Sequence, residues 1–263
     1  MTIFDIDFGQ RYRDHMAAAG GREKPSEAWD ARAAGMARQT QDSSYARAFV
    51  DRMDLSAATT LLDVGCGTGT IALALAGRME RVYGLDYSAG MLAVLMENAA
   101  LRRFTNVEPI LRAWEDDWRD VPACDLVVAS RSTSVMDMAD ALAKLDAKAK
   151  RRVYLTSLVG GLFIDPGILE LLDRSPTPLP DYIYILNILY RMGRHPRVDY
   201  IETDSRLADT ESFDVFVRKL TQSVGELSDA ERARLAAWYD ADPERARRGG
   251  APFRWAFISW ETR

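Results

Sequence analysis

The chain has 263 residues, which suffice for one large α/β domain or for a core domain with an attached subdomain. Hydrophobic residues make up 48% and charged residues 28%, so the chain can build both a sizeable core and a hydrated surface. The formal net charge of −5 argues against a nucleic-acid partner, because proteins that bind phosphate backbones usually carry a net positive domain or a basic stripe. The short basic groups at 148–152 and 245–248 are interpreted as solvated helix ends.

Two cysteines, Cys66 and Cys124, occur in the chain, and their spacing matches neither a metal site nor a disulfide framework. Residues 1–10 are acidic and lack the apolar segment of a secretory signal. No apolar run reaches the length of about 18 residues that spans a membrane. We therefore expect a cytoplasmic protein with no bound metal and no membrane association.

Short β-rich runs alternate with longer helical stretches from residue 59 onward. The predicted strands cover 59–64, 81–85, 107–111, 124–129, 152–158, 198–202 and 253–260. Helices are predicted at 26–36, 43–53, 70–79, 88–102, 135–149, 182–191, 211–224 and 228–240. This alternation is typical of crossover units, and it predicts an α/β fold with a doubly wound, mostly parallel seven-stranded sheet and helices on both faces. The last strand is expected next to the sixth, with an antiparallel orientation as one option.

Two regions interrupt this alternation. Residues 1–56 precede the first strand and are predicted to form an N-terminal helical cap. Residues 160–196 hold five prolines around an aromatic helix, so we expect a lid-like helical insertion after strand five. The remaining residues, 57–159 and 197–263, are assigned to the α/β core, and all parts belong to one structural domain.

The strongest local signal is a glycine loop that follows the first strand. Gly65, Gly67 and Gly69 are spaced G-x-G-x-G between a buried strand and a helix, where free backbone N–H groups favour an anionic ligand. The dinucleotide pattern G-x-G-x-x-G would need a third glycine where Thr70 stands. Asp86 ends the second strand, a position that accepts hydrogen bonds from ribose hydroxyls in doubly wound sheets. Together these residues favour a nucleoside ligand, with a solvated turn aspartate as the alternative for Asp86.

Two segments resemble the motifs of class I S-adenosylmethionine-dependent methyltransferases. Residues 61–69, LLDVGCGTG, are similar to the first motif, and residues 82–88, VYGLDYS, followed by Met91 and Leu92, are similar to the second. The spacing between the two motifs also matches, and the resemblance covers about residues 26–158. It implies that S-adenosylmethionine is the cofactor and S-adenosylhomocysteine the product.

The resemblance also implies roles for individual residues. The three glycines would lie under the methionine part of the cofactor, Asp63 would anchor its amino group and Asp86 its ribose. The adenine would be flanked by Tyr87 or Met91. Cys66 is counted among the cofactor-binding residues of the loop, as a small residue that fits the turn and not as a redox group.

The region after the third strand departs from the family pattern, which usually has an aspartate facing the adenine amino group. We expect Trp114 and Glu115 to contact the adenine there, with Asp116 as a competitor and a core tryptophan as the structural alternative. After the fourth strand, Ser130 and Arg131 are expected to contact cofactor or substrate, although Arg131 could equally brace a neighbouring loop. The Asn/Asp-Pro-Pro-aromatic motif of nucleobase-amino methylases is absent at this position, which argues against amino methylation of DNA bases.

The sequence predicts a methyltransferase that acts on a small or medium-sized metabolite by in-line transfer to N or O. The aromatic helix at 182–191 favours an apolar or aromatic substrate, and Trp29, Arg32 and Tyr45 resemble residues that close over the cofactor in related enzymes. His15 and His195 lie in irregular regions, and neither is assigned as a general base. The alternatives are a non-catalytic S-adenosylmethionine-binding sensor or interaction protein and, disfavoured by Thr70, a nicotinamide-dependent oxidoreductase. No oligomeric state is predicted.

Overall fold

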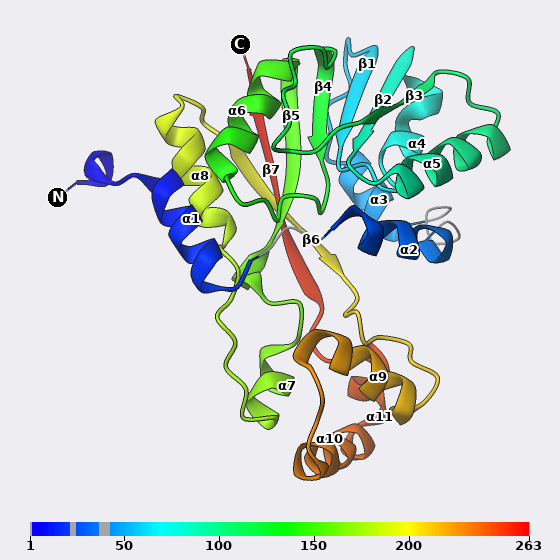
Figure 1. Cartoon of the computed structure of the whole chain (residues 1–263), viewed down its shortest axis with the longest axis vertical. Helices are drawn as coiled ribbons and strands as arrows, with labels where there is room; N and C mark the ends of the chain where they lie inside the picture. The colour runs from blue at the N-terminus through cyan, green and yellow to red at the C-terminus, as the bar shows by residue number, and fades with distance from the viewer. Residues whose placement is uncertain (1, 22–24, 37–42, 263) are drawn as a thin grey trace.

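Seven strands form one sheet in the order β3-β2-β1-β4-β5-β7-β6 (Figure 1). The computed structural model describes residues 2–21, 25–36 and 43–262. The strands are β1 (Thr60–Val64), β2 (Arg81–Asp86), β3 (Val107–Leu111), β4 (Cys124–Ala129), β5 (Ala149–Leu158), β6 (Arg197–Thr203) and β7 (Phe253–Glu261). The first five strands run parallel, whereas β7 runs antiparallel to β5 and β6. The predicted α/β fold class is confirmed, and so is the place of the last strand beside the sixth.

Alternate residues of the central strands pack on opposite faces of the sheet. Leu61 and Leu126 belong to one apolar cluster, whereas Leu62 and Val127 belong to another, and all four are fully buried. The helices α3 (Ser44–Val50), α4 (Ala72–Leu75) and α5 (Ala89–Leu101) contribute to the first cluster. The second is covered by α1 (Phe8–Ala18), α6 (Met138–Lys148) and α8 (Tyr182–Arg191). Burial on both faces explains the continuous apolar runs of the strands.

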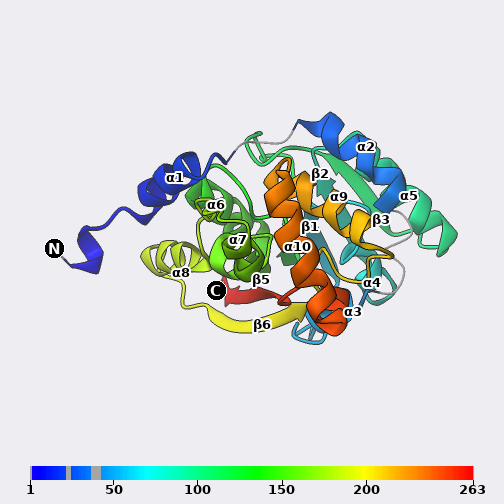
Figure 2. The same cartoon turned by 90° about the horizontal axis from the view of Figure 1, so that it is seen from below.

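A separate helical unit lies beyond the carboxyl ends of the parallel strands (Figures 1 and 2). It consists of α7 (Pro166–Leu171), α9 (Phe213–Val224), α10 (Asp229–Ala241) and α11 (Pro243–Arg248). Its own apolar cluster includes Ile168 of α7, Phe216 of α9 and Leu235 of α10, each of them fully buried. The unit therefore has a small core that is distinct from the two clusters on the sheet.

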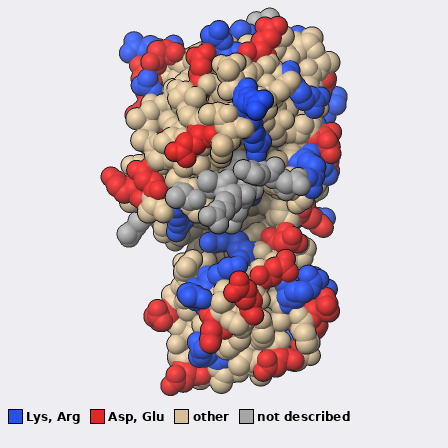
Figure 3. All heavy atoms as spheres, turned by 90° about the vertical axis from the view of Figure 1, so that its right-hand side faces the viewer, with Lys and Arg blue, Asp and Glu red and all other residues tan. Residues whose placement is uncertain are grey.

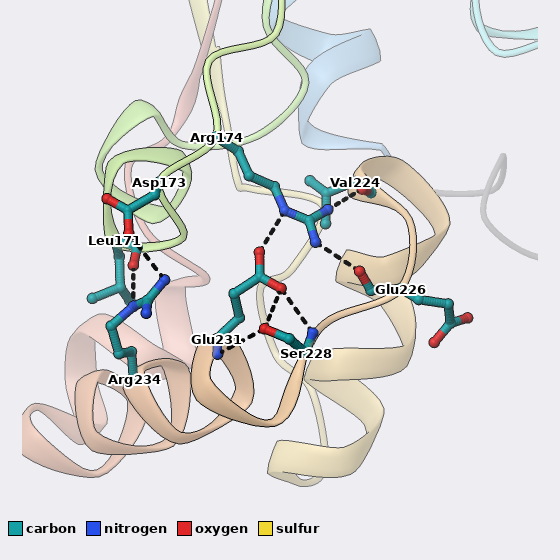
Figure 4. Close-up of polar contacts among 8 residues, drawn as sticks. All are labelled: Leu171, Asp173, Arg174, Val224, Glu226, Ser228, Glu231 and Arg234. Atoms are coloured by element: carbon teal, nitrogen blue, oxygen red, sulfur yellow. Dashed lines mark hydrogen bonds and ion pairs between the residues drawn. The ribbon is translucent and has the colours of Figure 1, made fainter.

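Arginine side chains tie the segment after α7 to α9 and α10 (Figure 4). Arg174 donates from Nε to Glu231 at 2.7 Å, and its other nitrogens donate to the carbonyls of Val224 and Glu226. Glu231 also closes a capping box with Ser228 at the start of α10. These bonds fix the orientation of α7 against the C-terminal helices.

The predicted insertion is divided between two places in the molecule. Its first helix, α7, joins the helical unit, whereas α8 packs on the sheet beside α1 and α6. The helices α1, α7 and α11 have no counterpart among the predicted elements. The division into cap, core and lid stays a prediction, and residues 22–24 and 37–42 of the predicted cap lie outside the described residues.

The remaining elements are α2 (Ser26–Met36) and the short 3-10 turns η1 (Ile3–Asp5), η2 (Ala76–Arg78) and η3 (Val159–Gly161). Within the described ranges, none of the helices has the length and apolar character needed to cross a membrane.

Candidate active site

The glycine loop adopts backbone angles that favour glycine at all three positions. The φ angles of Gly65, Gly67 and Gly69 are +65°, +52° and +93°. A Cβ added at Gly65 would overlap the side chain of Ser132, whereas at Gly67 the nearest atom would be the Met91 sulfur at 4.0 Å. The loop is therefore packed tightly against the end of β4, yet it leaves space beside Gly67 in which a ligand can approach the backbone.

Asp86 holds this loop from the end of β2. Its carboxylate accepts hydrogen bonds from the backbone N–H groups of Gly67 and Ser88, both at 2.9 Å. The side chain is only 7% exposed, and burial raises the pKa of Asp86 although these bonds oppose the shift. The backbone N–H of Tyr87 contributes a further bond, and the remaining acceptor capacity of the carboxylate is available to a polar ligand.

Asp63 lies beneath the loop at the end of β1. Its carboxylate accepts a hydrogen bond from the backbone N–H of Ala72 at 2.9 Å and so caps α4 from a distance in sequence. Burial raises the pKa of Asp63 to about 7. The neighbouring Cys66 is also buried, and burial raises the pKa of its thiol well above the usual value. A buried thiol with a raised pKa fits the interpretation of Cys66 as a small residue that fits the turn.

The helix α2 covers the start of α5 next to Asp86. Its Asp30 accepts hydrogen bonds from the Ser88 hydroxyl at 2.5 Å and from the Gly90 N–H at 2.8 Å. A small apolar cluster joins Met91 and Val94 of α5 to Ala33 of α2. Tyr87 is half-buried directly after Asp86, so the structure brings the second-motif residues together at one edge.

The residues after β3 form a turn at the same edge of the sheet. The half-buried ring of Trp114 lies 5.4 Å from the ring of Trp118, and its backbone carbonyl accepts a hydrogen bond from Lys144 of α6. Asp116 accepts from the N–H of Ala113 at 2.8 Å, whereas Glu115 is exposed. The proposed adenine contacts of Trp114 and Glu115 remain a prediction.

A hydroxyl network joins the ends of β4 and β5. The buried hydroxyl of Tyr45 lies 2.8 Å from both Ser130 Oγ and Thr156 Oγ1. Thr156 also accepts a hydrogen bond from the backbone N–H of Arg131 at 3.0 Å, and the Arg131 guanidinium lies 4.2 Å above the Tyr45 ring. Ser130 and Arg131 are thus held beside the glycine loop, because Ser132 in turn donates to the Val64 carbonyl at 2.7 Å.

A cavity opens at the ends of β4 and β5, next to this network. The cavity is small and partly open to solvent, and it lies between side chains of α1, the segment after β4, α6, β5, β7 and the segment before α8. The walls combine apolar side chains with hydroxyl groups and one arginine, and the lining residues are Tyr12, Met16, Arg131, Thr133, Ser134, Met138, Ser157, Leu158, Gly161, Phe163, Leu179, Pro180 and Trp255.

Neither histidine lines this cavity. His15 of α1 makes ring-nitrogen contacts to the Tyr184 hydroxyl at 3.2 Å and to the Pro178 carbonyl at 3.0 Å, which bridge α1 to the segment that includes α8. His195 is exposed beside Tyr190, with ring centroids 5.8 Å apart, in a shallow pocket on another part of the surface. The described parts of the chain contain no group of His, Cys, Asp and Glu side chains placed to hold a metal ion.

Comparison with known proteins assigns this arrangement to a family. Residues 61–151 match the family model of a methyltransferase domain. An uncharacterized protein of Haemophilus influenzae is 38% identical over 265 residues, which cover 99% of this chain and 98% of that protein. The chain belongs to the class I S-adenosylmethionine-dependent methyltransferases.

Two further similarities place this methyltransferase among its relatives. A structure of coclaurine N-methyltransferase bound to N-methylheliamine and S-adenosylhomocysteine has the same fold, with a TM-score of 0.53 and 11% identity over 98% of this chain and 96% of that one. An uncharacterized RNA methyltransferase of Bacillus cereus is 29% identical over 118 residues, which cover 42% of this chain and 25% of that protein. The cofactor of the enzyme is S-adenosylmethionine.

The residues of this methyltransferase fit that cofactor. The space beside Gly67 admits a ligand next to the backbone, and Asp86 presents a carboxylate at the same edge. Sequence reasoning missed Tyr12 and Met16, which line the neighbouring cavity, and Thr156, which belongs to the adjoining hydroxyl network. Tyr12 and Met16 are four residues apart, which is a helical apolar spacing that could have indicated α1.

Proposed function

We propose that the enzyme transfers the methyl group to a nitrogen or oxygen of a small or medium-sized metabolite bound in the cavity at the ends of β4 and β5. The observation that carries this proposal is the position of the cavity. Arg131 and Thr133 line it, and they belong to the same segment as Ser132, which packs on the glycine loop. Its apolar walls suit an aromatic or apolar acceptor, in line with the general character of ligand pockets.

The cofactor contacts follow from the same geometry. Gly65, Gly67 and Gly69 would lie under the methionine part and Asp63 would face its amino group. The remaining acceptor sites of Asp86 would bind the ribose hydroxyls. The adenine would lie between the side of α5 at Tyr87 and Met91 and the turn at Trp114 and Glu115, with Ser130 and Arg131 at the boundary to the acceptor.

The chemistry requires positioning more than acid or base groups from the protein. S-adenosylmethionine supplies a methyl group that its sulfonium already activates. The apolar side chains of the cavity exclude water, and the rigid ends of β4 and β5 hold the acceptor at near-attack distance. None of the described residues that line the cavity is a His, Asp or Glu. We therefore expect the pH dependence of the rate to follow the ionisation of the acceptor itself.

The small size of the cavity favours a small acceptor over RNA. It lies between α1 and the segments around η3 and Pro180, which restrict access by a macromolecule. The net charge of −5 also disfavours binding to a phosphate backbone.

The test combines cofactor binding with transfer of a radiolabelled methyl group. S-adenosylhomocysteine at about 100 times its dissociation constant should stabilise the protein by roughly 2.7 kcal/mol, whereas NAD should produce no shift. Label should then appear in small organic molecules of a cell extract and not in purified total RNA. Labelled RNA with unlabelled metabolites would refute the small-molecule proposal.

Matched carboxylate variants test the cofactor site. Asp86→Asn should weaken S-adenosylhomocysteine binding by about 1–3 kcal/mol, because it unpairs buried polar groups. Asp117→Asn, a change of the same chemistry at an exposed carboxylate, should leave the affinity unchanged. Equal affinities of the two variants would remove Asp86 from the ribose role.

A further inference from the structure

Arg131 has an unusual backbone conformation for an arginine. Its φ angle is +57°, in the left-handed region that costs a non-glycine residue about 1–3 kcal/mol. The conformation is held by the bond from its N–H to Thr156 Oγ1 and by the bonds of the next two residues, Ser132 to the Val64 carbonyl and Thr133 to the Thr156 carbonyl. Several hydrogen bonds thus fix the direction in which the Arg131 side chain leaves the end of β4.

The guanidinium of Arg131 is oriented but has no anionic partner among the described residues. It stacks over the Tyr45 ring at 4.2 Å, and the buried Tyr45 hydroxyl is itself held by Ser130 and Thr156. The five N–H donors of a guanidinium lie in its plane, so stacking leaves its edges available. By contrast, Arg13 on the neighbouring α1 is paired with Asp137 at 2.9 Å.

The cavity places Arg131 on the acceptor side of the active site. Arg131 lines it together with apolar residues of other elements, such as Met16, Phe163 and Trp255, whereas the glycine loop contributes none of the lining side chains. Arg131 is also the one charged side chain among the described residues that line it. Arg131 is itself exposed, so its guanidinium can be reached from solvent, and an oriented cation beside apolar side chains can pair with a single negative charge.

We propose that the methyl acceptor is an organic oxyanion, with a carboxylate or phosphate group that pairs with the Arg131 guanidinium and an apolar or aromatic body that packs against Phe163 and Trp255. The identification of this ligand with the methyl acceptor rests on the proposed function. The proposal that an oxyanion binds at Arg131 does not depend on the proposed function.

Positive charge also occurs at two arginines outside the residues that line the cavity. Arg206, between β6 and α9, lies close enough to Arg32 of α2 for the two charges to repel, and burial together with Arg32 lowers the pKa of Arg206. Figure 3 shows basic side chains, with acidic ones beside them, at the constriction between the sheet layers and the helical unit.

Titration calorimetry on the full chain saturated with S-adenosylhomocysteine tests the proposal. The probes are benzoate, phenyl phosphate and the neutral benzamide, at one ionic strength. The variants are Arg131→Met, Arg131→Lys and the control Arg119→Met, which makes the same change in charge at a side chain that is 91% exposed and pairs with Asp117. Binding of S-adenosylhomocysteine to each variant reports that it is folded.

At least one oxyanion should bind the wild-type protein ten-fold or more tightly than benzamide, and the comparison of benzoate with phenyl phosphate shows which group is preferred. Arg131→Met should lose this advantage, Arg131→Lys should keep part of it, and Arg119→Met should match the wild type. Oxyanion binding that survives in Arg131→Met, or that never exceeds benzamide binding, would overturn the proposal.

A ten-fold loss of S-adenosylhomocysteine affinity in Arg131→Met, with oxyanion binding intact, would place this arginine on the cofactor and would also overturn it. The same titration without S-adenosylhomocysteine reads the oxyanion site alone. A failure of the proposed function, with no small molecule methylated, is therefore distinguishable from a failure of this proposal.

Discussion

Replacing Asp63 by asparagine should change how the stability of the protein depends on pH. The Asp63 carboxyl is 1% exposed, and burial raises its pKa to about 7 from a value of 3.8 in the unfolded chain. Between these two values the native state holds a proton that the unfolded state releases. The free energy of unfolding of the wild type must therefore fall as pH rises through this window. Asparagine has no proton to lose, so Asp63→Asn lacks this part of the pH dependence.

The size of the effect follows from the shift. Each unit of difference in pKa corresponds to about 1.4 kcal/mol, so a difference of about three units amounts to up to about 4 kcal/mol. Urea unfolding of wild type and Asp63→Asn at pH values from about 4 to 8 measures it, provided that the dependence on urea concentration is the same for both. The variant should gain stability relative to the wild type across this range and level off above pH 7.

Asp125 offers a control with the opposite sign. Desolvation raises the pKa of Asp125, but hydrogen bonds from Thr59 and Thr60 outweigh it, so the pKa lies below the usual value. Asp125→Asn should therefore lose stability relative to the wild type as pH rises from the acid range to neutrality. If the curves of wild type and Asp63→Asn run parallel from pH 4 to 8, the reasoning about the buried carboxyl is wrong.

Three further changes test the site and the helical unit. Gly65→Ala should lower the melting temperature and weaken cofactor binding, since its φ is +65° and a Cβ there overlaps the neighbouring loop. The control Gly35→Ala, with open space around it in α2, should be neutral or stabilise the protein by up to about 1 kcal/mol. Thr156→Val should cost about 1–3 kcal/mol in urea unfolding by unpairing a buried hydroxyl and an N–H group, and Thr156→Ser should restore most of it. The hydrogen bond from Arg174 lowers the pKa of Glu231 to about 2, so the stability that it contributes is present above about pH 4.5 and is lost as pH falls toward 2. Glu231→Gln should therefore be less stable than the wild type at neutral pH and approach it in acid.

The parts of the fold that follow from local pattern could be predicted from the sequence. The run from Leu61 to Val64 is apolar because β1 is covered on both faces, and it stops where Gly65 must adopt a left-handed conformation. The same reasoning located β2 and its terminal Asp86, because the register of two parallel neighbours brings their carboxyl ends to one edge. Buried parallel strands leave a strong signal in the sequence.

The parts that depend on contacts between distant segments could not be predicted in this way. Thr156 joins Tyr45 to Arg131 across 111 and 25 residues, and nothing in its neighbourhood in the sequence indicates such a role. The helix α7 has six residues, which is too short for a periodic pattern to show. Both α7 and α11 nevertheless begin with an Asp-Pro pair, Asp165-Pro166 and Asp242-Pro243, which is a helix-start signal in the sequence that would have indicated them.

The helical unit is built from two stretches of chain that are separated by a return to the sheet. α7 precedes α8 and β6, whereas α9, α10 and α11 follow them, and all four share one apolar cluster. No single deletion that keeps α8 and β6 can therefore remove the unit. Excision of the stretch between β6 and β7 would expose the buried Ile168 and Leu169 of α7 as an apolar patch that favours aggregation. Grafting the unit onto another sheet would need two insertion points, so the loss or gain of the whole unit in a relative would take two separate events in the gene.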